Sequence, residues 1–196
     1  GKIDILLGTG LLATEPDLSG IDFLGVINLE QGMSFHDFRG QERVFWTLMS
    51  LAKLVYSDKG WGEMLIQSFD VKSIVIEAVK KLDYCLFYRH EITARRELKL
   101  PPFKELIILN LRGKDKKSVE DNAIKLFDIL MKENRNKDIF ISEPIPNPLP
   151  KLRDKFRWQV LIKVKNVKQA KDILCEIKVL RRRFRGSILT IDMELC

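Results

Sequence analysis

The sequence contains few of the residues that build metal centres and disulfide frameworks. Its 196 residues include only three cysteines and two histidines, and no run of about 18 apolar residues that could cross a membrane. Cys85, Cys175 and Cys196 are odd in number and form no CxxC pair, which argues against a disulfide framework and favours a cytosolic protein. Neither histidine lies near a cysteine pair, so we expect no metal site in this chain.

Catalytic patterns are also missing from the sequence. No GxxxxGKS/T loop occurs, and Gly8-Thr9-Gly10 lacks the third glycine of GxGxxG, so it reads as a plain turn. No Ser/His/Asp, Cys/His or paired-carboxylate arrangement supports a hydrolytic or nucleophilic active site. The chain opens on a predicted strand, Ile3 to Leu7, which indicates a piece of something longer.

The sequence does have an ordinary globular composition and an uneven charge. Hydrophobic residues make up 45% and charged residues 31%, and this length allows one large domain or two small ones. The net charge is +7. Residues 1–50 hold three basic and seven acidic side chains, a charge of −4, whereas residues 151–196 hold thirteen basic and five acidic ones, a charge of +8. This asymmetry indicates two functional regions, with an acidic partner for the second.

The first half is typical of the last part of an α/β domain. Short apolar runs predict buried strands at 3–7, 21–27 and 63–67, and helical periodicity predicts a helix over 37–56 that Asp37 could cap. Two further helices are expected within 71–98. Pro101 and Pro102 then end the helical pattern.

The second half predicts a β-α-β-β-α-β order, the split β-α-β arrangement of a ferredoxin-like, α+β fold. Strands are expected at 105–111, 139–142, 156–164 and 187–195, and helices at 117–132 and 167–180. The alternate prolines of 144–150 indicate a stiff extended loop. Two helices would cover one face of the sheet, leaving the other face free for a partner.

Three charged segments are candidate sites, each with a plainer interpretation. Arg181-Arg-Arg-Phe-Arg185 favours phosphate binding, although a solvated helix end is also possible. Residues 151–159 interleave basic and aromatic side chains, as nucleic-acid-binding segments do, but Trp158 shares a face with apolar neighbours and favours the core. Asp37 to Arg43 reads as a capped, salt-bridged helix start.

The chain resembles the C-terminal part of the PriA family of bacterial replication-restart helicases over nearly all of its length. Six segments match the family's motifs in order and spacing: DILLGTGLLAT at 4–14, MSFHDFRGQER at 33–43, GEMLIQS at 62–68, RELKLPPF at 96–103, EPIPNPLPKLRDKFRWQ at 143–159 and DMEL at 192–195. Any one match is weak, whereas their order together is specific. The resemblance implies three parts: the end of a RecA-like helicase lobe (1–69), a helical linker (70–103) and a PriA-type C-terminal binding domain (104–196).

Departures from the family point away from a working motor. Both arginines that would reach the nucleotide's γ-phosphate are replaced, by Leu54 and Ser57, and the family's Gln, Lys and final Gly of the first motif are Gly10, Thr14 and Glu15. An arginine finger supplies about three to five decades of rate. We therefore expect a degenerate lobe without ATPase activity, which keeps a vestigial helicase motif: Thr9, Asp37, Arg39 and Arg43. The family's ATP, Mg and Zn are bound through segments upstream, so no cofactor is expected in this chain.

The expected function is DNA binding in replication restart, within the bacterial cytoplasm. We expect forked or single-stranded DNA to contact Arg181, Arg182, Arg183, Arg185, Lys155 and Arg157. By resemblance, Lys155 and Gln159 would receive the acidic tail of single-strand binding protein, and other primosome proteins are further partners. Three alternatives stay open: a working 3′→5′ helicase, an RNA-contacting module, and a purely protein-docking remnant.

Overall fold

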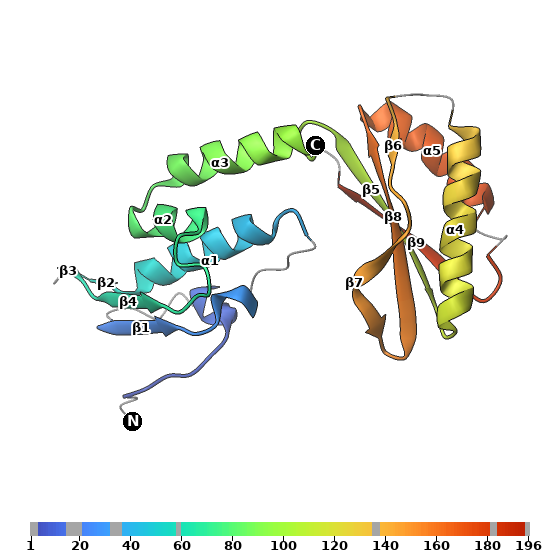
Figure 1. Cartoon of the computed structure of the whole chain (residues 1–196). Coiled ribbons are helices and arrows are strands. Elements are labelled where there is room, and N and C mark those ends of the chain that lie inside the picture. The colour runs from blue at the N-terminus through green and yellow to red at the C-terminus, as the bar shows by residue number, and fades with distance from the viewer. Residues whose placement is uncertain are drawn as a thin grey trace. The chain divides into compact units, whose positions relative to one another are not determined.

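Two separate hydrophobic cores divide the chain into two units. The computed structural model describes residues 4–14, 21–31, 37–57, 60–134, 138–180 and 184–194. Unit 1 is residues 1–93 and unit 2 is residues 94–196, and Figure 1 labels the helices and strands of both. The division into three parts that the sequence suggests stays a prediction.

Unit 1 is a small mixed arrangement of helices and short strands. Its elements are η1 (Gly10–Thr14), β1 (Phe23–Val26), η2 (Leu29–Gln31), α1 (Gly40–Leu54), β2 (Tyr56–Ser57), β3 (Gly60–Trp61), β4 (Glu63–Ile66), α2 (Ile74–Lys80) and the start of α3 (Tyr84–Glu97). β1 and β4 pair in parallel, with Gly25 opposite Leu65, as expected for two of the predicted parallel strands. β2 and β3 form a separate antiparallel pair.

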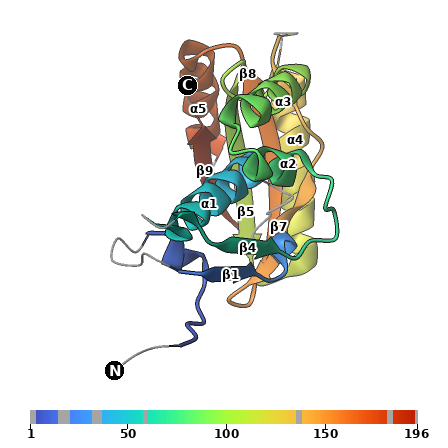
Figure 2. The same ribbon diagram turned by 90° about the vertical axis from the view of Figure 1, so that its left-hand side faces the viewer.

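The core of unit 1 lies between α1, α2 and the parallel pair. Val44, Phe45 and Leu48 recur at helical spacing on α1 and are almost fully buried, as the sequence pattern predicts. The Phe45 ring stacks on Phe87 of α3, with 4.3 Å between ring centroids and 3° between planes. Figure 2 shows α1 lying across β1 and β4.

The predicted first strand is wrong for the residues that can be described. Residues 4–9 form no helix or strand, and Ile5 and Leu7 are 81% and 87% exposed. A buried strand needs a neighbouring strand to satisfy its main-chain groups. The described part of the chain places no strand beside these residues.

Unit 2 is an α+β domain with a four-stranded antiparallel sheet and one added strand. Its elements are β5 (Glu105–Gly113), α4 (Lys116–Glu133), β6 (Phe140–Ile141), β7 (Ile145–Leu152), β8 (Lys155–Val164), α5 (Val167–Leu180) and β9 (Ile188–Glu194). The sheet order is β6-β8-β5-β9, with β7 also pairing with β8. This is the strand order of the split β-α-β arrangement.

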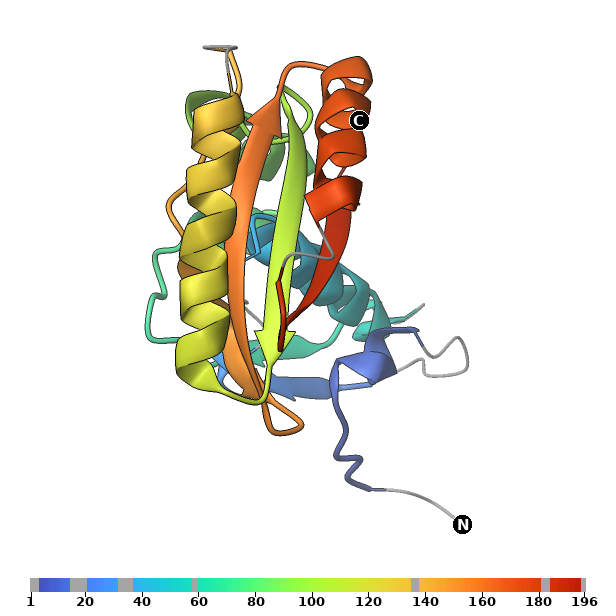
Figure 3. The same ribbon diagram turned by 90° about the vertical axis from the view of Figure 1, so that its right-hand side faces the viewer.

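Both helices of unit 2 cover the same face of the sheet, as Figure 3 shows. Ile107, Leu109 and Leu111 alternate along β5 and are fully buried beneath them. Asp115 caps α4 by accepting a hydrogen bond from the Ser118 main-chain N–H at 2.7 Å. We call the opposite side of the sheet, which carries the even-numbered residues of β5 and the odd-numbered residues of β8, the open face.

The proline-rich segment predicted as a loop is the edge strand β7. Ile145 and Pro146 pair with Gln159 and Trp158 of β8, and Lys151 and Leu152 pair again after an irregular stretch. Proline lacks an N–H donor but is tolerated on an edge strand, where one side needs no hydrogen bonds. Alternate prolines therefore interrupt the ladder in the middle without abolishing it.

Candidate nucleic-acid interface

Antiparallel pairing brings basic side chains from separate segments to one end of the unit 2 sheet. Arg112 of β5 lies directly opposite Arg157 of β8. Lys155 is two residues from Arg157 and shares its side of the strand, and Lys114 follows β5. We call Arg112, Lys114, Lys155 and Arg157, together with Arg185 described below, the basic end.

The turn from Phe184 to Ser187 brings Arg185 to the same end. Phe184 is 4% exposed and belongs to the unit 2 core, whereas Arg185 is exposed. Gly186 has a φ of +78°, a conformation that favours glycine. Ile188, which follows the turn, lies opposite Arg112 in β9.

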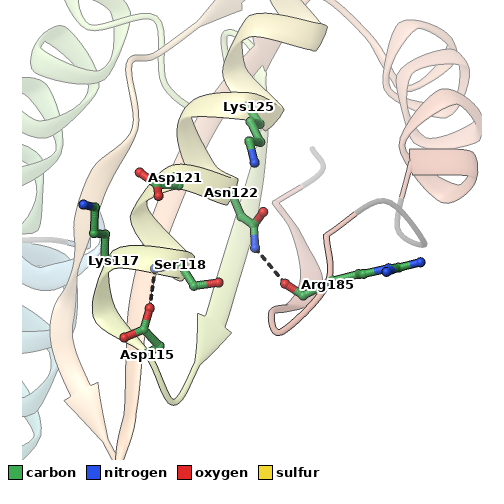
Figure 4. Close-up of a pocket in the computed structure, with 7 residues that line it drawn as sticks. All are labelled: Asp115, Lys117, Ser118, Asp121, Asn122, Lys125 and Arg185. Carbon is green, nitrogen blue, oxygen red and sulfur yellow. Dashed lines mark hydrogen bonds between the residues drawn. The ribbon is translucent and has the colours of Figure 1, made fainter.

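Asn122 of α4 holds this turn against the domain. Its side-chain amide donates to the main-chain oxygen of Arg185 at 3.1 Å and to the hydroxyl of Ser187 at 2.9 Å. Figure 4 shows the amide directed at the turn while the Arg185 guanidinium extends away from the helix. The backbone of Arg185 is therefore held in place, and its guanidinium has no partner among the residues that the structure describes.

An open hollow of about 690 Å³ lies between the start of α4 and this turn. Its lining carries charges of both signs: Asp115, Lys117, Ser118, Asp121, Asn122, Lys125 and Arg185. The two carboxylates would repel a phosphate placed deep within it. Lys117, Lys125 and Arg185 also line the hollow, so its charge is mixed, whereas the described sheet positions beside Arg112 carry no carboxylate.

The predicted contact residues on β8 differ in accessibility. Lys155 and Arg157 are half-buried with their charged ends on the open face, whereas Gln159 is only 7% exposed. The oxygen of the Gln159 side chain accepts from Asn147 of β7 at 3.1 Å, and Asn147 also donates to Asn110 at 2.9 Å. The side-chain oxygen of Gln159 is therefore engaged within the domain, and little of this side chain is exposed to a tail.

Trp158 lies on the core side, in agreement with the plainer interpretation of its alternation. It packs against the buried cluster that contains Val160 and Ile162. Phe156 is half-buried on that side, with the Lys151 ammonium 5.5 Å from its ring centroid. Neither ring belongs to the open face, so base stacking on these two aromatics finds no support.

At the end of the open face opposite the basic end, Lys163 already has a hydrogen-bond partner. The ammonium of Lys163 donates to the carbonyl oxygen of Leu98 at 2.7 Å. Burial, followed by the nearby charges of Lys104 and Lys99, lowers the pKa of Lys163. This end is therefore less suited to holding an external anion.

Three of the predicted DNA contacts, Arg181, Arg182 and Arg183, lie outside the described residues. Arg185 is the one member of that arginine cluster placed by the structure. Sequence reasoning missed Arg112, whose position opposite Arg157 depends on strand register. In the sequence, Arg112 stands two residues after Asn110, at the polar end of an apolar run, and this was the only signal that the two share a face of the strand.

The vestigial helicase residues gather at the start of α1 and at η1. Asp37 accepts a hydrogen bond from the Arg39 main-chain N–H at 2.9 Å and forms an ion pair with Arg43. The helix N-cap is Arg39, so the predicted capping role of Asp37 is wrong: its side chain closes a turn before the helix. The Thr9 hydroxyl accepts from the Leu11 main-chain N–H at 3.4 Å.

Comparison with known proteins identifies the family. Residues 96–194 match the family described as "Primosomal protein N C-terminal domain". The chain belongs to this family. Curated relatives named "Replication restart protein PriA" extend the match into unit 1.

The relatives cover most of this chain but are much longer. The relative from Synechocystis sp. is 31% identical over 163 residues, 83% of this chain and 20% of that protein. Those from Bacillus subtilis and Chlamydia pneumoniae are 30% and 34% identical, over 90% and 83% of this chain and 22% of each relative. The chain spans about a fifth of the length of these relatives and corresponds to a C-terminal part of PriA.

The described residues show neither a metal cluster nor a membrane-spanning helix. Within those ranges, no three His, Cys, Asp or Glu side chains gather as metal ligands would. No helix found there combines the length and the apolar character needed to cross a bilayer.

Proposed function

We propose that unit 2 is a DNA-binding part of a PriA-type replication-restart protein of the bacterial cytoplasm. The observation that carries this proposal is the basic end, where β5, β8 and the turn before β9 place cationic side chains together. DNA is a linear polyanion, so a cluster of cations gains by displacing its condensed counterions. Forked or single-stranded DNA is the proposed ligand, with Arg181, Arg182 and Arg183 extending the surface of Arg185, Lys155 and Arg157.

The acidic tail of single-strand binding protein is a second proposed ligand. Lys155 is accessible for a charge-assisted hydrogen bond to a carboxylate. The Gln159 side chain is only 7% exposed and its oxygen accepts from Asn147, so a carboxylate of the tail could use only the amide N–H groups of Gln159. DNA and the tail therefore compete for Lys155 in this proposal, and other primosome proteins would assemble around the same unit.

Unit 1 is proposed to be the end of a RecA-like helicase lobe that has no ATPase activity of its own. Leu54, at one of the two positions where the family has an arginine, is only 9% exposed. Arg43 is paired with Asp37 rather than open to a phosphate. ATP, Mg and Zn would be bound by segments of a longer protein, and ATP turnover by the intact protein would contradict the degenerate-lobe proposal.

The salt dependence of DNA binding by the full chain tests the DNA-binding proposal. We expect the logarithm of the affinity for forked DNA to fall linearly with the logarithm of salt concentration, with a slope of about −0.9 per neutralised phosphate. Replacing Arg181, Arg182, Arg183 and Arg185 together by Ala should flatten the slope. Lys171→Gln, an exposed position on α5, provides a control for charge and should leave the slope unchanged.

DNA-binding measurements on the full chain also distinguish DNA binding from an RNA-contacting module and from a protein-docking unit. Competition by RNA as strong as that by forked DNA would favour an RNA-contacting module. No measurable DNA affinity at low salt would refute DNA binding and favour a protein-docking unit. A slope that the four-alanine variant leaves unchanged would remove the arginine cluster from the interface.

A further inference from the structure

Two arginines face each other across neighbouring strands at the basic end. Arg112 and Arg157 are direct partners in the antiparallel β5–β8 register, so their side chains leave the same face of the sheet. Like charges in directly opposed positions destabilise a sheet. Neither guanidinium has a hydrogen bond or an ion pair with another residue that the structure describes.

Among the described residues, the sheet positions beside this pair hold no compensating carboxylate. The next row of the open face consists of Asn110, Gln159 and Thr190. The nearest acidic side chain of β9 on this face is Asp192, which lies opposite Ile108 and accepts a hydrogen bond from Asn110 at 2.8 Å. On the β9 side, Arg112 has Ile188 as its partner. The sheet therefore holds two adjacent cations without an internal anion.

We propose that Arg112 and Arg157 together form a binding site for one phosphate group of the DNA backbone. This inference rests on the proposed DNA-binding function and adds Arg112 as a contact that sequence reasoning missed. A guanidinium presents forked N–H donors that match phosphate oxygens. A phosphate between the two side chains replaces their mutual repulsion by two charge-assisted interactions.

The arrangement suits a chain of phosphates better than a single carboxylate. Lys155 lies two residues along β8 from Arg157, a separation of about 6.6–6.8 Å on the same face. The arginine pair and this lysine thus form two successive cationic rows. A nucleic-acid strand carries a charge at every nucleotide and can meet both rows, whereas one carboxylate can meet only one of them.

The unligated pair makes a distinctive prediction about stability. At low salt without phosphate, Arg112→Gln should raise the thermal midpoint of the full chain by about 1–4 °C, because it removes the repulsion. Arg157→Gln should do the same, and the double variant should gain little beyond either single change, since one substitution already ends the interaction. Lower midpoints for both single variants, or additive gains, would overturn the repulsion on which the site depends.

Inorganic phosphate is the probe for the site itself. At constant ionic strength, replacing chloride by phosphate should raise the midpoint of the unmodified chain and shift the guanidinium NMR signals of Arg112 and Arg157. Arg112→Gln should lose both effects, whereas Lys171→Gln should keep them. Equal stabilisation of Arg112→Gln and the unmodified chain would show that no specific site exists.

DNA then tests whether the site serves the proposed function. Arg112→Gln should make the salt slope for single-stranded DNA shallower by about 0.7, the value for one phosphate contact. An unchanged slope, with DNA still bound by both proteins, refutes this inference but leaves the DNA-binding proposal standing. If the unmodified chain binds no DNA, the DNA-binding proposal itself is refuted. A competing acidic peptide that displaces phosphate more strongly than single-stranded DNA does would assign the pair to a carboxylate instead.

Discussion

Asn122 donates its side-chain amide to the main-chain oxygen of Arg185 across 3.1 Å, which links the middle of α4 to the turn that precedes β9. Asn122 is 7% exposed, so its amide has little access to water. The carbonyl oxygen and the Ser187 hydroxyl both depend on this donor. The buried Asn122 side chain thus fixes the position of the Arg185 backbone, from which the charged side chain extends.

Asn122→Ala should therefore loosen the turn as well as destabilise unit 2. Loss of a buried donor costs about 1–3 kcal/mol in the free energy of unfolding. The salt slope of DNA binding should also become shallower, since Arg185 is no longer held. Asn166→Ala is a matched control, because Asn166 accepts a hydrogen bond from the Gln169 main-chain N–H at the start of α5. It should cost about 1 kcal/mol without changing the slope. Equal slopes for the two variants would contradict a positioning role for Asn122.

Gly113 is expected to tolerate no side chain. A Cβ built there would lie 2.6 Å from the main-chain oxygen of Gly186 and 2.8 Å from Val119. Gly113→Ala must push the turn away from β5, at a cost of about 1–3 kcal/mol in chemical denaturation. Gly25→Ala is the control, since its Cβ would meet only a Phe23 ring atom at 3.8 Å. Similar losses for both variants would argue against this close approach.

Periodicity predicted most of the fold because burial sets it directly. The alternation of Trp158, Val160 and Ile162 against Arg157 and Gln159 gave the correct faces of β8, since successive side chains of a strand point in opposite directions. The proline segment misled because prolines suggest a loop, yet the outer side of an edge strand needs no N–H donors. Whether an apolar run such as Ile5 to Leu7 becomes a strand depends on a neighbour that local sequence does not specify.

The candidate site was less accessible to sequence reasoning. Charge counting located the basic C-terminal segment, because an excess of arginine and lysine is visible without any structure. The facing of Arg112 and Arg157 depends on register between strands more than forty residues apart. Similarly, Gln159 reads as an exposed polar residue on β8, and only the folded β7 shows that Asn147 covers it.

Asn147→Ala should separate the stability of the open face from its binding capacity. The side-chain oxygens of Asn110 and Gln159, residues 6% and 7% exposed, would both lose a donor, which costs about 1–3 kcal/mol in unfolding free energy. A peptide with the acidic tail of single-strand binding protein should bind more tightly if it uses the released Gln159. Calorimetry measures both the unfolding free energy and the affinity for the peptide.

The control for this variant is Ser142→Ala. The Ser142 hydroxyl accepts from the Leu161 main-chain N–H at 2.9 Å, so its removal weakens the same edge of the sheet without releasing Gln159. Tail affinity should stay constant in that variant. Unchanged or weaker tail binding by Asn147→Ala would remove Gln159 from the proposed tail site.

The hydrogen bonds to Glu30 are expected to make the stability of unit 1 depend on pH. A hydrogen bond from the Ser68 hydroxyl, 2.6 Å from Oε1, is the main cause that lowers the pKa of Glu30, and the main-chain N–H of Phe69 contributes as well. A carboxyl whose pKa is depressed by folding stabilises the native state above its unfolded pKa of about 4.3. That stabilisation is lost as the pH falls through the lower, folded pKa.

Ser68→Ala should raise the pKa of Glu30 toward its ordinary value and move the acid unfolding midpoint to higher pH. The difference in stability between the variant and the unmodified chain should persist near neutral pH and shrink in acid, where Glu30 is protonated in every state. NMR titration of the Glu30 carboxyl carbon gives the pKa directly. If Ser68→Ala leaves the pKa of Glu30 unchanged, the Ser68 hydroxyl does not stabilise the ionised carboxylate.

The stacked rings of Phe45 and Phe87 are expected to join α3 to α1 within unit 1. Phe45 is fully buried and Phe87 is 2% exposed. Phe87→Ala should therefore cost about 3–5 kcal/mol in unfolding free energy, whereas Phe87→Leu should cost less than about 1.5 kcal/mol. A double-mutant cycle with Phe45→Leu should recover about 0.5–1.5 kcal/mol for the ring contact itself. Tyr88→Leu, one residue along α3 and 48% exposed, should change stability by no more than about 0.5 kcal/mol. A larger loss at Tyr88 than at Phe87 would place the anchoring contact on the outer side of α3 instead.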